Sequence, residues 1–277
     1  MFFVLQWDYM LRDDAALKIG ITFNYKRFIL NTDITEDPKD GKMRLSLRDK
    51  EADSVKEMFM DRARLHRKGY QHRTIKIIDR MMLDALLEAD RHFTLTGPTG
   101  ETFRLSEACD DVKLFSQLTD EYLVRSLQYS SKPELANTRA ILYRIATRKL
   151  YKLVALIDSV NTSVDFKGLQ RTLKEVTESS SSLNSVDLTI LRKRVNMGMG
   201  NNNPVEKVSF FDKRGGTVVF TSDQLRKDLP KDFSSQSLLL VCKKTDQYSV
   251  REAKNVFQEW SREAFNNQEQ EINLSIV

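Results

Sequence analysis

The sequence has few cysteines, few glycines and prolines, and no long hydrophobic run. Its two cysteines, Cys109 and Cys242, lie far apart and form no CxxC or other metal-ligand spacing, which excludes a disulfide scaffold and a zinc ribbon. The longest apolar segments, such as 238–242, fall well short of the roughly 18 residues that a membrane-spanning helix needs. The apolar start over 1–5 is too short for a signal-peptide core, and no small-residue cleavage site follows it. We therefore expect a soluble intracellular protein from a reducing compartment, with no membrane partner.

Several catalytic motifs are missing as well. Only three histidines are present, His66, His72 and His92, and there is no HExxH, His-Asp, GxSxG, GxxxxGK[ST] or CxxC motif. His66 and His72 are six residues apart, so on a helix they point in different directions and make a poor metal-binding pair. The residues themselves therefore predict no metal site.

The composition is that of a globular protein. Of the 277 residues, 40% are hydrophobic and 30% charged, with 10 Gly and 5 Pro, which predicts one large or two modest domains with a buried core. The 44 basic residues exceed the 39 acidic ones by five, a charge that matters only where it is concentrated. No internal repeat at solenoid periods is present.

Helical periodicity dominates the first 155 residues, and the pattern changes after Asp158. The strict alternation over 43–48 predicts a strand with Met43, Leu45 and Leu47 on its apolar face, and 93–105 has the pattern of a hairpin around Gly97 and Gly100. The sequence predicts helices at these positions: 7–17, 24–30, 53–91 with a break at Gly69, 111–127 and 134–145. Core-facing positions of the long helix are expected at Ile75, Ile78, Met82 or Met81, Ala85 and Ala89.

The second part of the chain mixes strand and helix patterns. Alternating runs predict strands over 186–191, 205–211 and 218–221, and the Gly/Asn-rich segment 197–204 predicts a loop. Ser249 with Glu252 has the capping-box spacing of a helix start, followed by an apolar stripe of Ala253, Phe257, Trp260 and Ala264. The fold class we predict is mostly α, with a helical lobe over 1–155 that carries small β-hairpins and a smaller α/β lobe over 156–277.

Positive charge is concentrated between Arg62 and Arg80, a segment with seven Lys and Arg residues and a single acidic residue. On a helix, Arg62, His66 and Tyr70 follow one another at i, i+4 and share a face, with Arg73 close by. A guanidinium, an imidazole and a phenol in a row suit a phosphate-bearing ligand. The alternative is an ordinary solvated basic face.

Three smaller patterns suggest contacts with a nucleotide. Arg44 and Arg48 lie about 7 Å apart on one face of the predicted strand, with Lys50 continuing that face; the alternative is a charged edge strand. Tyr9 and Asp13 form an i, i+4 pair that can accept a ribose hydroxyl or be a plain surface pair. The segment 148–152 would bring Arg148 and Lys152 together one helical turn apart.

Several strings together resemble one family. They are 6–9 (QWDY) with 12–13 (RD), 24–29 (NYKRFI), 48–51 (RDKE), 65–72 (LHRKGYQH) and 203–210 (NPVEKVSF). The sequence is similar, over nearly all its length, to the C-terminal half of the vertebrate deoxynucleoside triphosphate triphosphohydrolases that contain a SAM domain and an HD domain. The resemblance weakens over 162–185 and in the final residues.

The resemblance implies hydrolysis of a dNTP to a deoxynucleoside and triphosphate, with GTP and dNTP as allosteric nucleotides that assemble tetramers, in the nucleus. The fold it implies is the helical, C-terminal part of an HD-type phosphohydrolase domain followed by the α/β lobe. By motif, the catalytic residues would be those that contact the sugar, base and triphosphate: Tyr9, Asp13, Arg62, His66, Tyr70 and Gln71. The effector-binding residues would be Arg27, Arg48, Lys50, His72, Arg73, Arg148, Lys152 and Lys213.

The sequence also departs from the family. The family binds a divalent metal (Mg, Mn, Zn or Fe) through a His…His-Asp…Asp set, and the SAM domain and the histidine-bearing segment have no counterpart here. Leu5 stands where the family has its last metal-binding Asp, Gln6 stands for the following Lys, and Asn31 replaces an aromatic residue near the allosteric site. Leucine cannot ligate a metal, so we expect this chain to be inactive alone.

Two other functions remain open. One is a non-catalytic protein that binds nucleotides or joins oligomers of a full-length relative, as a homo-oligomer or hetero-oligomer. The other is weak nucleic-acid binding by the cluster from Arg62 to Arg80, which would depend steeply on salt.

Overall fold

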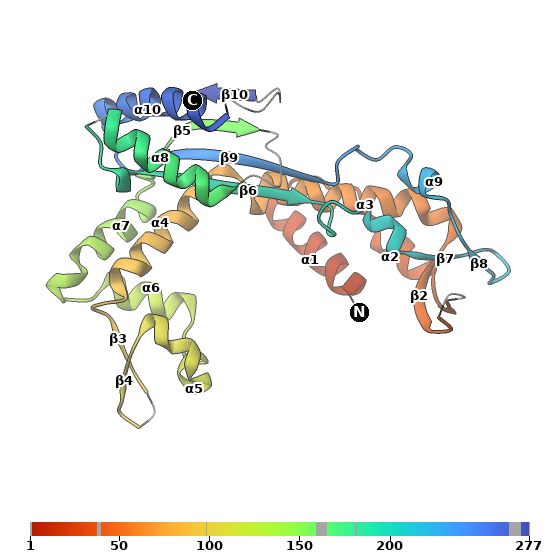
Figure 1. Cartoon of the computed structure of the whole chain (residues 1–277). Coiled ribbons are helices and arrows are strands. Elements are labelled where there is room, and N and C mark those ends of the chain that lie inside the picture. Colours follow the sequence, from red (N-terminus) through yellow and green to blue (C-terminus); the bar gives the residue numbers. More distant parts are fainter. Residues whose placement is uncertain are drawn as a thin grey trace. The chain divides into compact units, whose positions relative to one another are not determined.

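The computed structural model describes residues 2–37, 40–97, 99–158, 165–180, 182–265 and 273–276 (Figure 1). The described chain is mostly helical and has three small sheets, as the sequence predicted for its fold class. It forms two compact units. Unit 1 contains the described residues of Met1–His72 and Lys193–Ser237, and unit 2 contains those of Arg73–Asp158, Ser163–Arg192 and Leu238–Val277.

Unit 1 consists of helices around a four-stranded sheet. Its helices are α1 (Phe2–Leu17), α2 (Tyr25–Leu30), α3 (Ala52–Leu65), a π-helix over His66–Tyr70, and α9 (Ser222–Arg226). Its strands are β1 (Thr32–Glu36), β2 (Met43–Arg48), β7 (Ser209–Phe211) and β8 (Thr217–Val218), in the order β1-β2-β7-β8. Aromatic residues dominate the core: Trp7 of α1 packs edge-on against Phe28 of α2 at 5.5 Å between ring centroids, and its indole N–H donates to Met58 Sδ of α3 at 3.2 Å.

Strand β2 has the predicted bounds, but its predicted apolar face is confirmed only at Leu47 and is wrong at Met43 and Leu45. Met43 is 63% exposed and Leu45 is exposed too, whereas Ser46 and Leu47 are buried. The reason is that β7 pairs with β2 only over Ser46–Arg48, so only the end of the strand is covered. Ser46 tolerates burial because its hydroxyl bonds that of Thr35 at 2.7 Å.

Unit 2 combines a helical part with a second four-stranded sheet. Its helices are α4 (Arg73–Ala89), α5 (Val112–Phe115), α6 (Asp120–Gln128), α7 (Ala136–Ala146), α8 (Phe166–Ser180) and α10 (Gln247–Phe265). Its strands are β3 (Thr94–Thr96), β4 (Thr102–Arg104), β5 (Lys152–Asp158), β6 (Leu188–Asn196), β9 (Ser234–Cys242) and β10 (Asn273–Ile276). Strands β3 and β4 form the predicted hairpin, the large sheet has the order β10-β5-β9-β6, and the boundary of the two units falls within β6 and β9.

The large sheet of unit 2 is covered on both faces. Leu239 and Val241 of β9 pack against Ile77 and Met81 of α4. Alternation along the strand places Leu238 and Leu240 on the opposite face, and Figure 1 shows α10 on the side of the sheet away from α4. This explains why 236–242 are buried without interruption and why 238–242 form a continuous apolar run in the sequence.

The two units interleave along the chain, whereas the sequence predicted two consecutive lobes. Strand β5 pairs antiparallel with β9, so the end of the predicted first lobe and the middle of the predicted second lobe share one sheet. Such pairing between distant segments has no local signal in the sequence. The lobe division at 155/156 stays a prediction about the domains of the family.

Other helix predictions need correction. The predicted helix 53–91 is two α-helices joined through a π-helix, and the predicted helix 111–127 is the two short helices α5 and α6. On α4, Ala85 and Ala89 face the core as predicted, but Ile77 is buried in place of Ile75, which is 39% exposed. Met81, the predicted alternative to Met82, is buried too, so the buried positions follow one another at i, i+4 back from Ala89 and reach Ile77 instead of Ile75.

Helix α10 begins two residues earlier than predicted. Asp246 caps it, because its carboxylate accepts a hydrogen bond from the Ser249 backbone N–H at 2.8 Å, so the predicted Ser249–Glu252 capping box is wrong. The predicted stripe is confirmed at its centre, where Ala253, Phe257 and Trp260 are buried. No helix in the described part of the chain combines the length and apolarity needed to cross a bilayer.

Candidate functional site

Helix α1 carries Tyr9 and Asp13. Trp7 and Met10 of the same helix are buried in the core of unit 1, which fixes the rotation of α1 about its axis. Tyr9 and Asp13 are therefore held half-buried at the margin of this core. Their i, i+4 spacing places both on the same side of the helix.

The other half of the site lies where α3 becomes a π-helix. The backbone N–H of Gln71 donates to the His66 carbonyl at 2.7 Å, the i→i+5 bond of a π-turn, and π-turns are frequent at functional sites. Gly69 is buried within this turn, and a Cβ there would lie 2.9 Å from Leu17 Cδ1 at the end of α1. Glycine thus permits close approach of the π-helix to α1.

The two halves meet through Tyr70 and Asp13. The Tyr70 hydroxyl donates a hydrogen bond to the Asp13 carboxylate, although 57 residues separate them in the chain. The His66 ring packs edge-on against Tyr70, with centroids 4.7 Å apart and planes at 73°. Three of the six predicted catalytic residues are therefore in one connected set.

Electrostatics couples two more residues to this set. Burial, the bond to Asp13 and the nearby Tyr9 all raise the pKa of the Tyr70 phenol well above its usual value, so it stays a neutral hydrogen-bond donor. Burial and the adjacent positive charge of Arg62 lower the pKa of His66 to about 4, so its imidazole is neutral at pH 7. Gln71 is half-buried beside them, and its backbone closes the π-turn.

Arg62 is held by the end of strand β6. Its Nη1 donates to the Asn196 carbonyl at 2.6 Å, which occupies one of the five N–H donors of the guanidinium. The set thus offers a guanidinium and a neutral imidazole as donors, beside a Tyr70 hydroxyl whose one donor is bonded to the Asp13 carboxylate. Such a set can bind phosphate oxygens and a sugar hydroxyl.

The predicted effector residues of unit 1 fall into a different environment. Arg27 forms an ion pair with Glu51, with Nε 2.7 Å from Oε2 of a fully buried carboxylate. Arg48 lies over the Phe211 ring at 5.7 Å and 3.7 Å from Asp49, and its backbone N–H bonds the Asn31 carbonyl. The remaining predicted effector residues of this unit are exposed: Lys50, His72 and Lys213.

The predicted helical pairing of Arg148 with Lys152 is wrong. Helix α7 ends at Ala146, Arg148 adopts a left-handed backbone with φ of 60°, and Lys152 is the first residue of strand β5. Arg148 and Lys152 are both exposed, as is Arg73 at the start of α4. The left-handed residue reverses the chain between helix and strand, which a periodicity argument does not detect.

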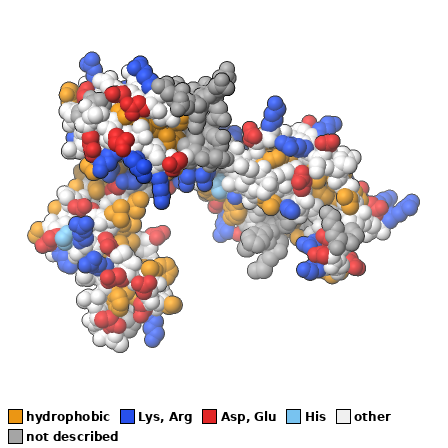
Figure 2. All heavy atoms as spheres, viewed as in Figure 1, with side chains coloured by type: hydrophobic (Ala, Val, Ile, Leu, Met, Phe, Trp, Pro, Cys, Tyr) orange, Lys and Arg blue, Asp and Glu red, His pale blue; other side chains and the backbone are white. Residues whose placement is uncertain are grey.

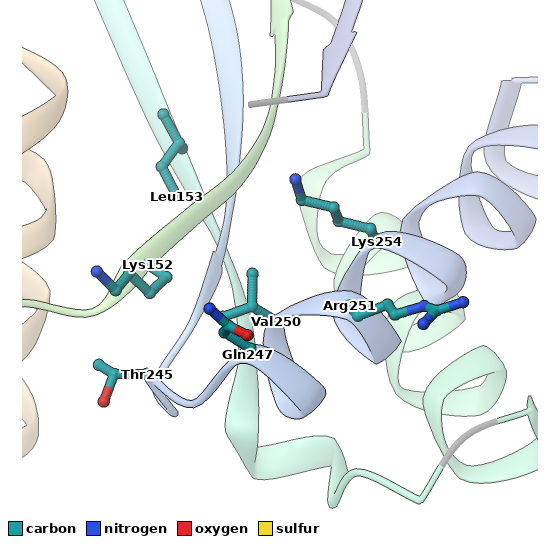
Figure 3. A pocket seen from close by; sticks show the side chains of 7 residues that line it. All are labelled: Lys152, Leu153, Thr245, Gln247, Val250, Arg251 and Lys254. Atoms are coloured by element: carbon teal, nitrogen blue, oxygen red, sulfur yellow. The ribbon is translucent and has the colours of Figure 1, made fainter.

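Lys152 nevertheless lines a cavity of unit 2. Its volume is about 590 Å³, and it is lined by Lys152, Leu153, Thr245, Gln247, Val250, Arg251 and Lys254. Figure 3 shows Lys152 extending from β5 and Lys254 and Arg251 from α10, with Arg251 directed away from Lys152. Three basic side chains and no acidic one make the cavity suitable for an anion.

A metal ion does not fit the described residues. No group of three or more His, Cys, Asp or Glu side chains in the described part of the chain is arranged to hold one. We therefore derive no chemical step through a metal.

Two elements of the site were not identified from the sequence. One is the π-helix, whose only sequence signal was the expected break at Gly69. The other is the contact of Arg62 with Asn196, which comes from the end of β6 just before the predicted Gly/Asn-rich loop.

Comparison with known proteins identifies relatives of this chain by sequence. No family model matches the chain. The chain is 35% identical over 263 residues to the deoxynucleoside triphosphate triphosphohydrolase SAMHD1 of Danio rerio and 34% identical over 264 residues to that of Homo sapiens; each match covers 92% of this chain and 42% of the relative. A putative HD domain-containing protein of Acanthamoeba polyphaga mimivirus is 26% identical over 231 residues, which is 78% of this chain and 46% of that protein.

These matches define first the class of protein and then the family. The chain is homologous to deoxynucleoside triphosphate triphosphohydrolases. The particular family is SAMHD1, and the chain matches the C-terminal part of its members. It spans less than half the length of the relatives named above.

Proposed function

We propose that this chain forms the sugar- and triphosphate-binding side of a dNTP triphosphohydrolase site, within the helical part of an HD-type domain. The observation that carries the proposal is the Tyr70–Asp13 hydrogen bond, with His66 packed against Tyr70 and Arg62 beside His66. In this arrangement Arg62, His66 and Tyr70 would contact phosphate oxygens, Tyr9 and Asp13 the sugar, and Gln71 the sugar or base. These groups bind and orient the nucleotide, and the proposal gives none of them the role of activating the attacking water.

Hydrolysis by this chain is not expected. In the homologous family a divalent metal (Mg, Mn, Zn or Fe) would supply the charge that activates the attacking water. Leu5 occupies the position of a metal-binding Asp and Gln6 that of a Lys, and neither side chain can replace the residue it stands for. Binding without turnover is therefore the activity we assign.

Regulation by nucleotides is a second part of the proposal. Effector dNTP would contact Arg27, Arg48, Lys50, His72, Arg73 and Lys213, and GTP would contact Arg148 and Lys152. The anion-compatible cavity at Lys152 supports the GTP assignment. The ion pair of Arg27 with buried Glu51 opposes the dNTP assignment of Arg27, because a phosphate would have to compete with a carboxylate. A nuclear location and assembly into homo-oligomers or hetero-oligomers with a full-length relative are proposed from the family alone.

The proposal is tested by titrating the protein with dGTP and with inorganic tripolyphosphate in a calorimeter. Arg62→Ala and Tyr70→Phe should each weaken tripolyphosphate binding about tenfold, the effect of losing one hydrogen bond to a charged group. Arg125→Ala is the matched control, because Arg125 is exposed on α6 and pairs only with Glu121 among its described neighbours. Equal affinity in wild type, R62A and R125A would contradict the proposed site.

Turnover is measured in the same samples. With dGTP, GTP and Mg²⁺ or Mn²⁺ present, triphosphate should not rise above a buffer blank. Release above the blank would disprove the predicted inactivity.

A non-catalytic interaction protein remains the alternative to this function. The apolar stripe of α10 does not favour it, because Phe257 and Trp260 are buried within unit 2. Its test is co-purification with a full-length relative.

A further inference from the structure

We infer that the turn at Asn196–Gly198 is a positioning element that holds the Arg62 guanidinium in place for a phosphate ligand. This inference rests on the proposed function of Arg62 and adds to it two residues, Asn196 and Gly198, that the family resemblance did not assign to the site. Both lie in unit 1, as Arg62 does.

The contact with Arg62 is direct. Arg62 Nη1 donates to the Asn196 backbone carbonyl at 2.6 Å and lies 3.5 Å from the Asn196 side-chain oxygen. An arginine side chain has four rotatable bonds, and ordering it for a ligand costs conformational entropy. A contact that orders the guanidinium before the ligand arrives removes part of this cost from binding.

The turn itself is rigidly built. The Asn196 side-chain oxygen accepts a hydrogen bond from the Gly198 backbone N–H at 2.8 Å, which closes the turn on itself. The intervening Met197 is buried in the core of unit 1, and its N–H bonds the Phe233 carbonyl at 3.0 Å. The Asn196 carbonyl is thus fixed relative to the core.

Gly198 is required by its backbone conformation. Its φ of +119° belongs to the region that only glycine adopts without strain. A Cβ at this position would lie 3.7 Å from Arg62 Nε, in ordinary van der Waals contact, so the turn lies directly against the Arg62 side chain.

Only part of the guanidinium is occupied by the turn. One of its five donors bonds Asn196, and the others remain for a ligand. The same placement keeps the positive charge close to His66, whose pKa it helps to lower. The turn therefore acts on two of the proposed phosphate-binding groups through one contact.

The test compares Asn196→Ala with Asn201→Ala, which changes an exposed asparagine a few residues further along the chain. Inorganic tripolyphosphate is titrated into both variants by calorimetry, alone and combined with Arg62→Ala. We expect N196A to weaken binding about tenfold and N201A to leave it unchanged. In the Arg62→Ala background, N196A should weaken binding less than twofold further, because its effect is transmitted through Arg62.

A purely structural role would give a different result. If N196A weakens binding equally with and without Arg62, or leaves it unchanged while Arg62→Ala weakens it, the inference is wrong. If Arg62→Ala has no effect on tripolyphosphate affinity, the proposed function fails, and the inference is then decided by NMR titration of His66. If N196A displaces the Arg62 guanidinium, its positive charge moves away from His66 and the pKa of His66 should rise. An unchanged His66 pKa in N196A overturns the inference.

A second variant guards against misfolding. Gly198→Ala keeps both oxygens of Asn196 but strains the turn. Its tripolyphosphate affinity is measured with and without Arg62→Ala, and its His66 pKa by NMR, as for N196A. If N196A does not fold, the result for Gly198→Ala decides.

Discussion

Two ionisable side chains of the site, Tyr70 and His66, remain uncharged at pH 7, and a hydrogen bond holds each of Tyr70 and Arg62 in place. Arg62 is tied to a carbonyl, Tyr70 is bound to Asp13, and burial and Arg62 hold His66 neutral. A neutral imidazole next to a guanidinium can donate a hydrogen bond to a phosphate oxygen without adding to the repulsion between cations. This makes His66 the residue whose titration reports most directly on the site.

We predict that His66 titrates with a pKa of about 4 in the folded protein, compared with 6.5 when unfolded. Between pH 6.5 and 4 the unfolded state binds the proton and the folded state does not, so stability falls as the pH is lowered through this window. The loss is on the order of 1–3 kcal/mol, after allowance for the partial exposure of the ring. Urea unfolding of wild type and His66→Gln at several pH values measures it.

The histidine variant should show a smaller loss of unfolding free energy than wild type between pH 6.5 and 4. His92→Gln serves as the control, because His92 is exposed on the turn after α4. Identical pH profiles for wild type and H66Q would refute the depressed pKa.

At the scale of elements, the site depends on the hydrogen bonds that connect the segment after α1 to α1 and α3. The segment between α1 and α2 is held by two carboxylates. Asp14 accepts from the Gly20 N–H at 2.7 Å, and Asp61 of α3 accepts from the Thr22 and Phe23 N–H groups at 2.7 and 3.1 Å. Because these bonds connect the end of α1 to the middle of α3, they set how Asp13 meets Tyr70.

We predict that Asp61→Ala destabilises the protein by about 2–4 kcal/mol. The substitution leaves the buried Phe23 N–H without its acceptor and removes the partner of Arg64, whose Nη1 lies 2.6 Å from Asp61. Urea unfolding at pH 7 measures the change. Asp79→Ala is the matched control: Asp79 is largely exposed and 3.9 Å from Lys76, so its loss should cost less than about 0.5 kcal/mol, and equal effects would contradict the prediction.

At the scale of the whole molecule, charge is dispersed. Figure 2 shows acidic and basic side chains interspersed on the visible face of the protein. The basic cluster predicted from the sequence is partly neutralised, because Arg64 pairs with Asp61 and Arg80 with Asp84 at 2.6 and 2.9 Å. Arg64 and Arg80 of this cluster are therefore not fully available to a polyanion.

We accordingly predict only weak binding to a single-stranded oligonucleotide. The plot of log affinity against log salt should have a slope with magnitude below about 3, since few phosphates can displace counterions. Fluorescence anisotropy of a labelled 20-mer over a range of KCl concentrations measures it. A slope steeper than about 6 would instead favour nucleic-acid binding as a function of the protein.

Much of the local structure could be predicted from residue patterns. The alternation over 43–48 and the turn glycines of the β3–β4 hairpin locate those strands, and the stripe of α10 identifies its buried face. The strands β5 and β9 were not predicted, because a strand buried on both faces lacks alternation. The start of α10 was misplaced because Asp246 and Ser249 are both good capping residues.

The sequence by itself determined which residues share a helix face, since Tyr9 with Asp13 and Arg62 with His66 follow the local period of the helix. Only the tertiary structure decided that these faces meet. The Tyr70–Asp13 and Arg62–Asn196 bonds join residues 57 and 134 positions apart, and no period in the sequence encodes such contacts. They depend on core packing and on the π-turn at Gly69, which bring distant segments together only once the chain has folded.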